Sequence, residues 1–279
     1  MNIKYIFLRL IRHFMPETMA RFLLKRRWII RPGLESSDPF AAVDQYRKTL
    51  AQHKKSIHDQ RVLVFGYGGR FAVGVELLKQ GASHVVLCDH FVLPDHERNL
   101  ELLPKYNEYL HVVNGEVIPR TEHITLLHGD IRDNTIQAQI PAVDLVLSTS
   151  VYEHLDDVDG ITHALAKLTT PQGAHLHFVD LRDHYFTHPF EMLSFSKNIW
   201  VNFLNPTSNL NRFRLKDYEK IFKSCFERTD INALQRQEVE FQKVRARIRP
   251  EFLTGNEAMD SVTLIHVFAE SPMKEIKHA

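Results

Sequence analysis

Cysteine is scarce in this chain, with two residues in 279, and the sequence contains no long apolar run. Two cysteines cannot form a disulfide framework, so we expect a reducing, cytoplasmic compartment. No stretch approaches the 18 or so apolar residues that a membrane-spanning helix needs. The net charge of the whole chain is +1, so total charge gives no reason to expect a nucleic-acid partner. The length predicts one large domain with an appendage or insertions.

Common metal and nucleic-acid signatures are missing as well. Seventeen histidines prompt a search for a metal site, but no CxxC or HExxH pattern accompanies them. His175 and His177 fall on one side of a predicted strand, but no metal-binding motif accompanies them in sequence. We therefore expect no metal site. Most of the histidines should be either buried with hydrogen-bond partners or exposed to solvent.

Positive charge is concentrated at the amino-terminal end. Residues 1–32 hold eight lysines and arginines against one glutamate, a net charge of +7, so the rest of the chain carries −6. Ile3, Phe7, Leu10 and Phe14 share one face of a predicted helix. Two interpretations stay open for residues 1–32: a lid that packs its apolar face onto the main domain, or peripheral contact with an anionic membrane surface. We take residues 1–57 as a helical extension and residues 58–279 as the main domain.

Residues 61–89 contain the most informative pattern in the chain. A short apolar run at 62–65 leads into Gly66-Tyr67-Gly68-Gly69, a helical stretch follows, and a second apolar run at 85–88 ends at Asp89. Short strands that are apolar throughout suit a parallel sheet covered on both faces. Glycines before a helix allow backbone N–H groups to approach a ligand, and an acid after the second strand can bind ribose hydroxyls. The pattern predicts a ligand that contains adenosine.

The remaining elements repeat the β-α alternation. We expect further strands at 124–127, 143–147 and 174–181, and helices near 37–57, 156–168 and 216–226. Residues 91–122 are predicted to form an insertion over the site, with a helix near 99–110. Residues 262–269 are strongly β-forming and have no helix after them, so an antiparallel final strand is expected. This pattern predicts an α/β fold with a doubly wound, mostly parallel seven-stranded sheet.

Five ordered motifs over residues 60–270 resemble those of class I S-adenosylmethionine-dependent methyltransferases. They are VLVFGYGGRF, Asp89, HGDIRD, VDLVLSTSVYEHLDDV and LTTPQGAHLHFVDLRDH. The resemblance implies S-adenosyl-L-methionine as cofactor and an acceptor that is a small molecule, a glycan or a lipid-linked compound. The GxGG turn, the DLRDH segment and Asn211-Arg212-Phe213-Arg214 resemble a subgroup that acts on small molecules and glycans. No NPPY or DPPY motif follows the fourth strand, so a nucleic-acid substrate is not expected.

The resemblance also implies roles for individual residues. The backbone of the glycine turn would hold the methionine end of the cofactor, Asp89 the ribose, and Asp130 and Ile131 the adenine. Ser148 lies where the chain passes the sulfonium. The sequence departs from the family at Val64, where many members carry an acid near the cofactor's amino group.

Candidate catalytic residues follow the fourth and fifth strands. His184 is the first candidate for a general base, with Asp183 placed to orient it, and His154 is the second. A structural polar network is the alternative, because methyl transfer needs mainly alignment and a base only where the acceptor loses a proton.

The segment at 185–215 is aromatic and is predicted to be a helical insertion on the substrate side. Its rings could line an acceptor pocket or form the core of a small cap, and Arg212 and Arg214 could bind an anionic acceptor or form surface salt bridges. Two other functions stay open. One is an inactive cofactor-binding partner subunit. The other is a nicotinamide-dependent reductase, which Phe71 disfavours because a dinucleotide motif needs glycine there.

Overall fold

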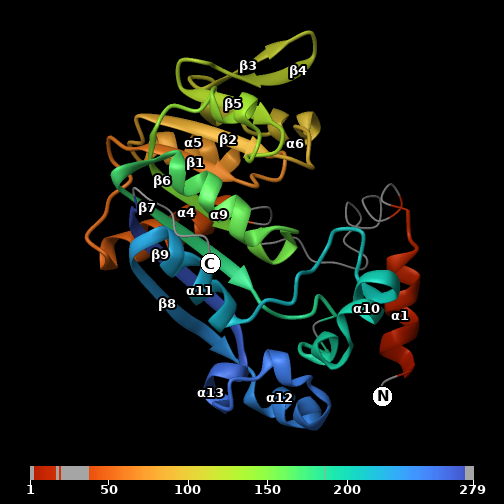
Figure 1. The fold of residues 1–279 in the computed structure, drawn as a ribbon. Helices are drawn as coiled ribbons and strands as arrows, with labels where there is room; N and C mark the ends of the chain where they lie inside the picture. Colours follow the sequence, from red (N-terminus) through yellow and green to blue (C-terminus); the bar gives the residue numbers. More distant parts are fainter. Residues whose placement is uncertain (1–2, 17–18, 20–37, 186, 274–279) are drawn as a thin grey trace.

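The computed structural model describes residues 3–16, 19, 38–185 and 187–273. Within these residues the chain forms a seven-stranded sheet of order β5-β2-β1-β6-β7-β9-β8 (Figure 1). The strands are β1 (Arg61–Phe65), β2 (His84–Asp89), β5 (Ile124–His128), β6 (Val143–Thr149), β7 (Thr169–Asp180), β8 (Phe226–Arg236) and β9 (Val262–Pro272). β9 pairs antiparallel with both β7 and β8, and the other pairs are parallel. The predicted doubly wound sheet and its antiparallel final strand are confirmed.

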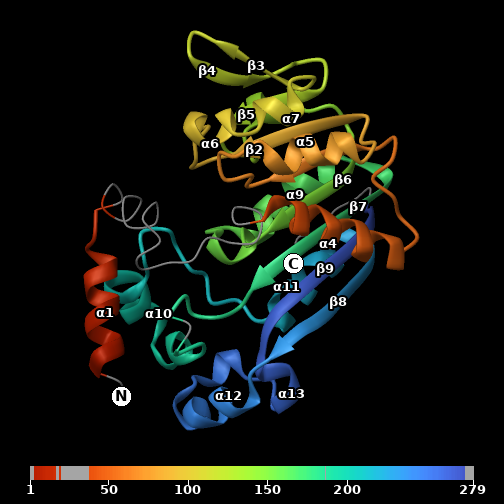
Figure 2. The ribbon, with the colours of Figure 1, turned by 180° about the vertical axis from the view of Figure 1, so that it is seen from behind.

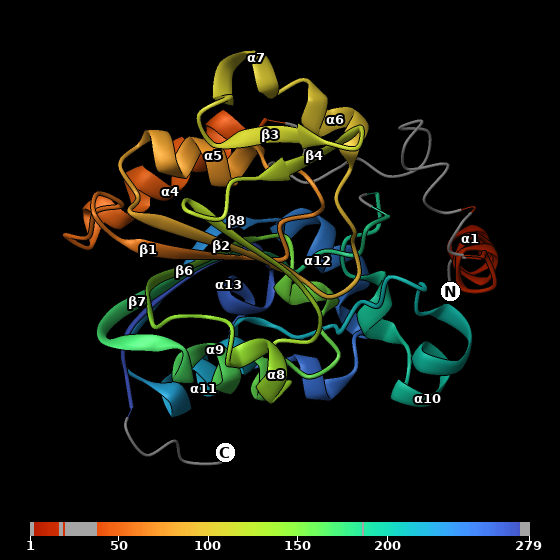
Figure 3. The same cartoon turned by 90° about the horizontal axis from the view of Figure 1, so that it is seen from above.

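Helices cover both faces of this sheet, as the view along it shows (Figure 3). Alternate residues of β1 point to opposite faces, so that Val62 and Val64 join one core and Leu63 and Phe65 the other. The first core is covered by α4 (Pro39–Gln52) and α5 (Ala72–Lys79), and the second by α9 (Val158–Lys167) and α11 (Leu215–Cys225). The short helix α8 spans Asn134–Gln137.

Helix α4 begins as the sequence predicts. The side chain of Asp38 accepts the backbone N–H of Ala41, and Pro39 occupies the first turn, where its missing N–H costs nothing. Val43, Tyr46 and Leu50 pack on the sheet as expected, whereas the predicted fourth member of that face, Phe40, is 45% exposed.

The long connection after β2 differs from the prediction. Instead of one helix near 99–110 it forms α6 (His96–Leu100), α7 (Leu103–Tyr106) and an antiparallel hairpin of β3 (Leu110–Val113) and β4 (Glu116–Pro119). Asn114 and Gly115 form the turn of this hairpin, both with positive φ, as a two-residue Asn-Gly turn requires. Figures 1 and 2 show the hairpin beyond the β5 edge of the sheet.

The segment after β7 forms a separate small cap with its own core. It contains η2 (Glu191–Ser194), α10 (Lys197–Ile199) and η3 (Trp200–Leu204), and it packs with α12 (Glu238–Val244), η4 (Arg245–Arg247) and η5 (Pro250–Phe252). Another short helix, α13, spans Glu257–Asp260. Phe190, Phe195 and Trp200 are buried in this cap core, which favours the cap over the acceptor pocket as the role of these rings. Phe186 lies outside the described residues.

Arg212 and Arg214 hold the cap through backbone carbonyls, and this overturns both predicted roles. The guanidinium of Arg212 donates to the carbonyls of Met192 (3.1 Å) and Phe195 (2.7 Å). That of Arg214 donates to the carbonyls of Leu181 and Val262, beside β7 and β9. Burial lowers the pKa of each guanidinium to about 10. Both side chains are therefore internal braces that neither reach an acceptor nor form surface salt bridges.

The amino-terminal helix α1 (Ile3–His13) docks on this cap with the opposite face to the one expected. Figures 1 and 2 both show it beside α10. Its buried residues are Tyr5, Arg9 and Arg12, whereas Ile3 is 78% exposed and Phe7 62% exposed. A lid that buries the apolar face is thus wrong for α1. No helix among the described residues is long and apolar enough to cross a membrane.

Candidate functional site

The glycine turn after β1 is fixed by backbone angles and by close packing. Gly66 and Gly69 have φ of +75° and +78°, a region that side-chain-bearing residues rarely adopt. A Cβ at Gly66 would lie 2.5 Å from Val151 Cγ2, and one at Gly69 would lie 2.5 Å from the carbonyl oxygen of Leu93. The turn therefore lies against the loop after β6 and the start of the connection after β2. Gly68 also has positive φ, +67°.

Tyr67 contributes to this turn through its backbone. Its ring is 5% exposed and stacks on Phe71, with 6.1 Å between ring centroids. Burial raises the pKa of the phenol, with Asp89 and Cys88 adding to the effect. The ring is therefore held in the core, and the peptide group of Tyr67 lies in the turn.

Asp89 joins the end of β2 to the glycine turn. One carboxylate oxygen accepts the backbone N–H of Gly68 at 3.0 Å, and the other accepts those of Phe91 and Val92 at 2.9 Å each. A carboxylate has about four lone-pair positions, so capacity remains for a hydroxyl ligand. The predicted ribose residue thus lies directly beside the predicted cofactor turn.

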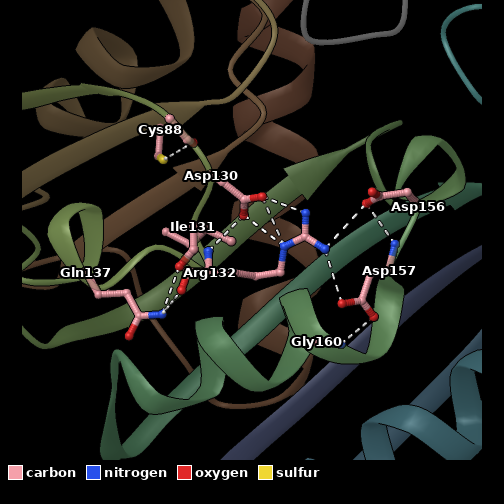
Figure 4. A network of polar contacts seen from close by, with 9 residues as sticks. Cys88, Asp130, Ile131, Arg132, Gln137, Asp156, Asp157 and Gly160 are labelled. Carbon is pink, nitrogen blue, oxygen red and sulfur yellow. Dashed lines mark hydrogen bonds and ion pairs between the residues drawn. The ribbon is translucent and has the colours of Figure 1, made fainter.

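Asp130 follows β5, the strand next to β2, and is held by Arg132 (Figure 4). The guanidinium donates to Asp130 Oδ1 from Nε at 3.0 Å and to Oδ2 from Nη2 at 2.5 Å. Hydrogen bonds from Arg132 lower the pKa of Asp130. The residue at the amino-terminal cap position of α8 is Asp133 and not Asp130, so Asp130 does not serve as a helix cap there. The side chain of Ile131 is 2% exposed and lies in the core.

Ser148 lies at the end of β6, and its hydroxyl points into the core. Its Oγ is hydrogen-bonded to His177 Nδ1 at 2.8 Å, and neither side chain is exposed. Burial lowers the pKa of His177 and brings that of His175 to about 3, so both imidazoles are neutral structural groups. Any contact of Ser148 with the cofactor is left to its backbone.

The two base candidates meet at the carboxyl ends of β6 and β7. His154 belongs to the short helix η1 (Tyr152–His154), and its ring centroid lies 4.9 Å from that of His184. Burial lowers the pKa of His184 to about 3, with His154 and nearby arginines adding to the effect. An imidazole with that pKa is a weak proton acceptor at neutral pH, so alignment fits this site better than base catalysis.

Asp183 does not orient His184, contrary to the sequence-based expectation. Its carboxylate accepts hydrogen bonds from Tyr5 Oη and Arg9 Nη2 of α1, and from the backbone N–H of Tyr185 at 2.9 Å. The Asp183 side chain is completely buried. It therefore anchors α1 to the loop after β7.

Two groups that the sequence analysis did not assign also lie here. Tyr46 Oη and Thr149 Oγ1 are 2.7 Å apart, at the end of β6 on the face that Val64 shares. Glu153 is 3% exposed and has a carboxylate oxygen without a hydrogen-bond partner in the part of the chain that the structure describes. Burial raises the pKa of Glu153 well above its usual value, and Asp180 adds to this. The EH pair in sequence signals Glu153, but nothing in sequence links Tyr46 to strand β6.

Two surface hollows lie elsewhere, at the amino-terminal ends of β7 and β8. Their volumes are about 690 and 900 Å³, and their linings include Phe226 in one and Thr169 in the other. None of the predicted site residues lines them. We place the site at the carboxyl ends of the parallel strands, where open α/β sheets bind ligands.

Neither protein-family models nor curated proteins match this chain. Several solved structures, in contrast, are similar to it in fold. Phosphoethanolamine N-methyltransferase 2 of Haemonchus contortus, in complex with phosphomonomethylethanolamine and S-adenosylhomocysteine, aligns with a TM-score of 0.53 and 14% identity over 98% of this chain and 61% of that one. A candidate sarcosine dimethylglycine methyltransferase of Galdieria sulphuraria aligns with a TM-score of 0.50 and 14% identity, over 83% of this chain and 86% of that one. The narrower subgroup stays a prediction. The fold of this chain is the Rossmann-like fold of the class I S-adenosylmethionine-dependent methyltransferases.

Proposed function

We propose that this protein is an S-adenosylmethionine-dependent methyltransferase. One observation carries the proposal: the glycine turn, Asp89 and Asp130 follow β1, β2 and β5, three neighbouring parallel strands whose carboxyl ends meet at one edge. Asp89 also accepts the N–H of Gly68, so the turn and the acid form one unit. This arrangement suits an elongated ligand with a ribose in its middle.

Each group at this edge takes one part of the cofactor in our proposal. The backbone of residues 66–69 binds the methionine end, Asp89 the ribose hydroxyls, and Asp130 with Ile131 the adenine. The hydroxyls of Tyr46 and Thr149 take the amino group in place of the acid absent at Val64, because they lie on the same face just beyond it. The cofactor brings an activated methyl group, and the protein aligns an acceptor with it.

The acceptor side is formed by η1 and the loop after β7, where His154, His184 and Asp180 gather. A small molecule, a glycan or a lipid-linked compound are the acceptor classes proposed for this chain. A nicotinamide-dependent reductase is disfavoured further by Phe71, because a large, fully buried side chain stands at the start of α5 where a dinucleotide motif needs glycine. An inactive partner subunit would bind the cofactor at the same residues.

Calorimetric titration with S-adenosylhomocysteine and with NADPH tests the cofactor. We expect binding of the first and no response to the second. Asp89→Ala should weaken S-adenosylhomocysteine affinity by about tenfold or more, because a hydrogen bond to a charged group contributes about 1.5–3 kcal/mol. Asp133→Ala, an exposed acid one turn away from the site, is the control. Failure of the wild type to bind, or unchanged affinity in Asp89→Ala, would contradict the assignment.

We also propose that the exposed face of α1 contacts an anionic membrane surface, peripherally. Ile3 and Phe7 on α1 and Phe14 just after it are 78%, 62% and 68% exposed. Residues 1–32 have a net charge of +7 in sequence, of which Arg9 and Arg12 are turned into the cap. Apolar residues flanked by basic ones suit the boundary between headgroups and acyl chains. Such contact would bring a lipid-linked acceptor to the cap on which α1 docks.

Sedimentation with vesicles tests this contact. The full chain should bind phosphatidylcholine vesicles that contain phosphatidylglycerol and bind pure phosphatidylcholine vesicles much less, since the attraction is partly electrostatic. Phe7→Ser should reduce the bound fraction. Val239→Ser, which alters a side chain 71% exposed on α12, should not. Equal binding by Phe7→Ser and the wild type would overturn the proposal.

A further inference from the structure

Three side chains with metal-ligating atoms converge beside the proposed acceptor site. Glu153 and His154 come from η1 after β6, and His184 comes from the loop after β7. One ligand atom from each lies within 4.8 Å of the other two. Because the neighbouring strands β6 and β7 are parallel, their carboxyl ends bring these separate segments together.

His154 is already oriented as a ligand. Its Nδ1 lies 2.8 Å from the carbonyl oxygen of Asn209 and 3.0 Å from that of Ser208. Carbonyl oxygens accept hydrogen bonds, so Nδ1 carries the proton and the lone pair of the neutral ring lies on Nε2. Asn209 Nδ2 in turn donates to the carbonyl of His154 at 3.0 Å, which fixes the loop. Metal-binding histidines are commonly held by this outer hydrogen bond.

Glu153, whose carboxyl group contributes one of these ligand atoms, also has an oxygen without a hydrogen-bond partner among the described residues. Its side chain is 3% exposed, and the oxygen concerned is Oε2. A buried carboxylate oxygen without a donor or cation is costly, so its persistence at this position needs an explanation. A bound cation supplies one.

The nearby arginines are each engaged with a partner other than Glu153, and two of them pair with carboxylates. Arg182 forms a fork with Asp180, with Nε to Oδ1 at 2.8 Å and Nη2 to Oδ2 at 2.6 Å. Arg9 is paired with Asp183. The third arginine whose charge acts on His184, Arg12, donates to Thr207 Oγ1 at 2.8 Å. The carboxylates of Asp180 and Asp183 thus offset two of the three cations, and Glu153 faces the histidines.

We propose that Glu153, His154 and His184 bind one divalent transition-metal ion. Two imidazole nitrogens with one carboxylate oxygen favour zinc, iron, cobalt or manganese over magnesium and calcium, which prefer oxygen ligands alone. Three protein ligands leave coordination positions open. His154 and His184 are partly exposed, so an outside oxygen can reach those positions.

The proposed metal site also indicates which chemical class of acceptor would bind, and this inference rests on the proposed methyltransferase function. An ion between the carboxyl ends of β6 and β7 would bind an acceptor with an anionic or hydroxyl oxygen next to its methylation point. His184 lies 30 positions after His154 in sequence and belongs to another loop, so the proposed ligands fall outside any HExxH or CxxC spacing.

Metal binding is measured on the full-length, metal-free protein, first with Co²⁺ by visible absorption and then with Zn²⁺ by calorimetry. We expect one ion per chain. Glu153→Gln and His184→Gln should each weaken binding by about tenfold or more, as loss of even an outer-shell partner costs that much. His58→Gln is the matched control, since His58 is 70% exposed and pairs with Asp59 on the far side of β1.

Circular dichroism and thermal unfolding of each variant check that it is folded. If Glu153→Gln does not fold, His184→Gln decides the question, because that ring is partly exposed. Unchanged Co²⁺ affinity in folded His184→Gln, or no binding by the wild type, overturns the metal site. S-adenosylhomocysteine titration of the same samples separates the two proposals. Co²⁺ binding without cofactor binding would support the metal site and contradict the methyltransferase proposal. Cofactor binding without Co²⁺ binding would support the methyltransferase proposal and contradict the metal site.

Discussion

Two loops of this protein share almost the same four residues and use them differently. Asp130-Ile131-Arg132-Asp133 follows β5, and Asp180-Leu181-Arg182-Asp183 follows β7. In both, the first aspartate accepts the backbone N–H of the arginine two residues on at 2.9 Å, and the guanidinium forks onto the same carboxylate. Aspartate commonly forms this local turn, so the shared geometry follows from the shared sequence.

The fourth residue separates the loops. Asp133 is exposed and stands at the amino end of α8. Asp183 is fully buried and binds Tyr5 and Arg9 of α1. The turn is thus determined locally, whereas the role of its last acid depends on a partner 174 positions away.

The arginines differ in a related way. Arg132 extends from its fork to Asp157 at 3.2 Å, and Asp157 caps α9, so Arg132 links the loop after β5 to the loop after β6 (Figure 4). Arg182 is less exposed and its charge acts on Glu153 and His184. One loop therefore faces the proposed cofactor end, and the other faces the acceptor end and the proposed ion.

The largest effect should come from breaking the buried anchor. Asp183→Asn leaves the Arg9 guanidinium, 1% exposed, without its counter-charge. Removing one partner of a buried ion pair costs about 3–5 kcal/mol, so the free energy of unfolding in urea should fall by about that amount. Hydrogen exchange of residues 3–13 should rise as α1 detaches.

Asp133→Asn is the matched change in the other loop. Its side chain is exposed and caps α8 without a side-chain hydrogen bond, so the free energy of unfolding should stay within about 0.5 kcal/mol of the wild type. Equal losses in Asp183→Asn and Asp133→Asn would remove the distinction drawn between the two loops.

The same distinction explains what could be predicted from sequence. The parallel strands could be predicted because each contains a short apolar run, and two of these runs lead directly into Gly66 and Asp89. The hairpin of β3 and β4 was not predicted although Asn114-Gly115 signals it, because residues 91–122 were interpreted as one insertion with a single helix.

The contacts between residues that are far apart in sequence could not be predicted from the sequence. One of the two interpretations of residues 1–32, the lid, buries the apolar face of α1, yet Arg9 and Arg12 are buried instead, because Asp183 and Thr207 offer partners inside the cap. Arg212 and Arg214 likewise bind carbonyls that the fold brings to them. Charge placement of this kind depends on tertiary contacts and leaves no periodic signal.

A smaller loss of stability is expected from breaking the Arg132–Asp130 pair in the loop after β5. Arg132→Met removes the pair with Asp130, and since Arg132 is 34% exposed the loss at pH 7 should be about 1 kcal/mol or less. Hydrogen bonds from Arg132 lower the pKa of Asp130 in the folded protein. The stabilisation is therefore complete above the unfolded aspartate pKa of about 3.9 and is lost as pH falls through the lower folded value.

Urea unfolding of the wild type and Arg132→Met over a pH series measures this. The difference in unfolding free energy should be constant from pH 7 to pH 5 and should shrink below about pH 4, as Asp130 becomes protonated in the unfolded chain. A difference that stays constant down to pH 3 would mean that Arg132 acts through Asp157 or through packing. The fork on Asp130 would then add no stability, and the adenine-side acid would be held by its backbone turn alone.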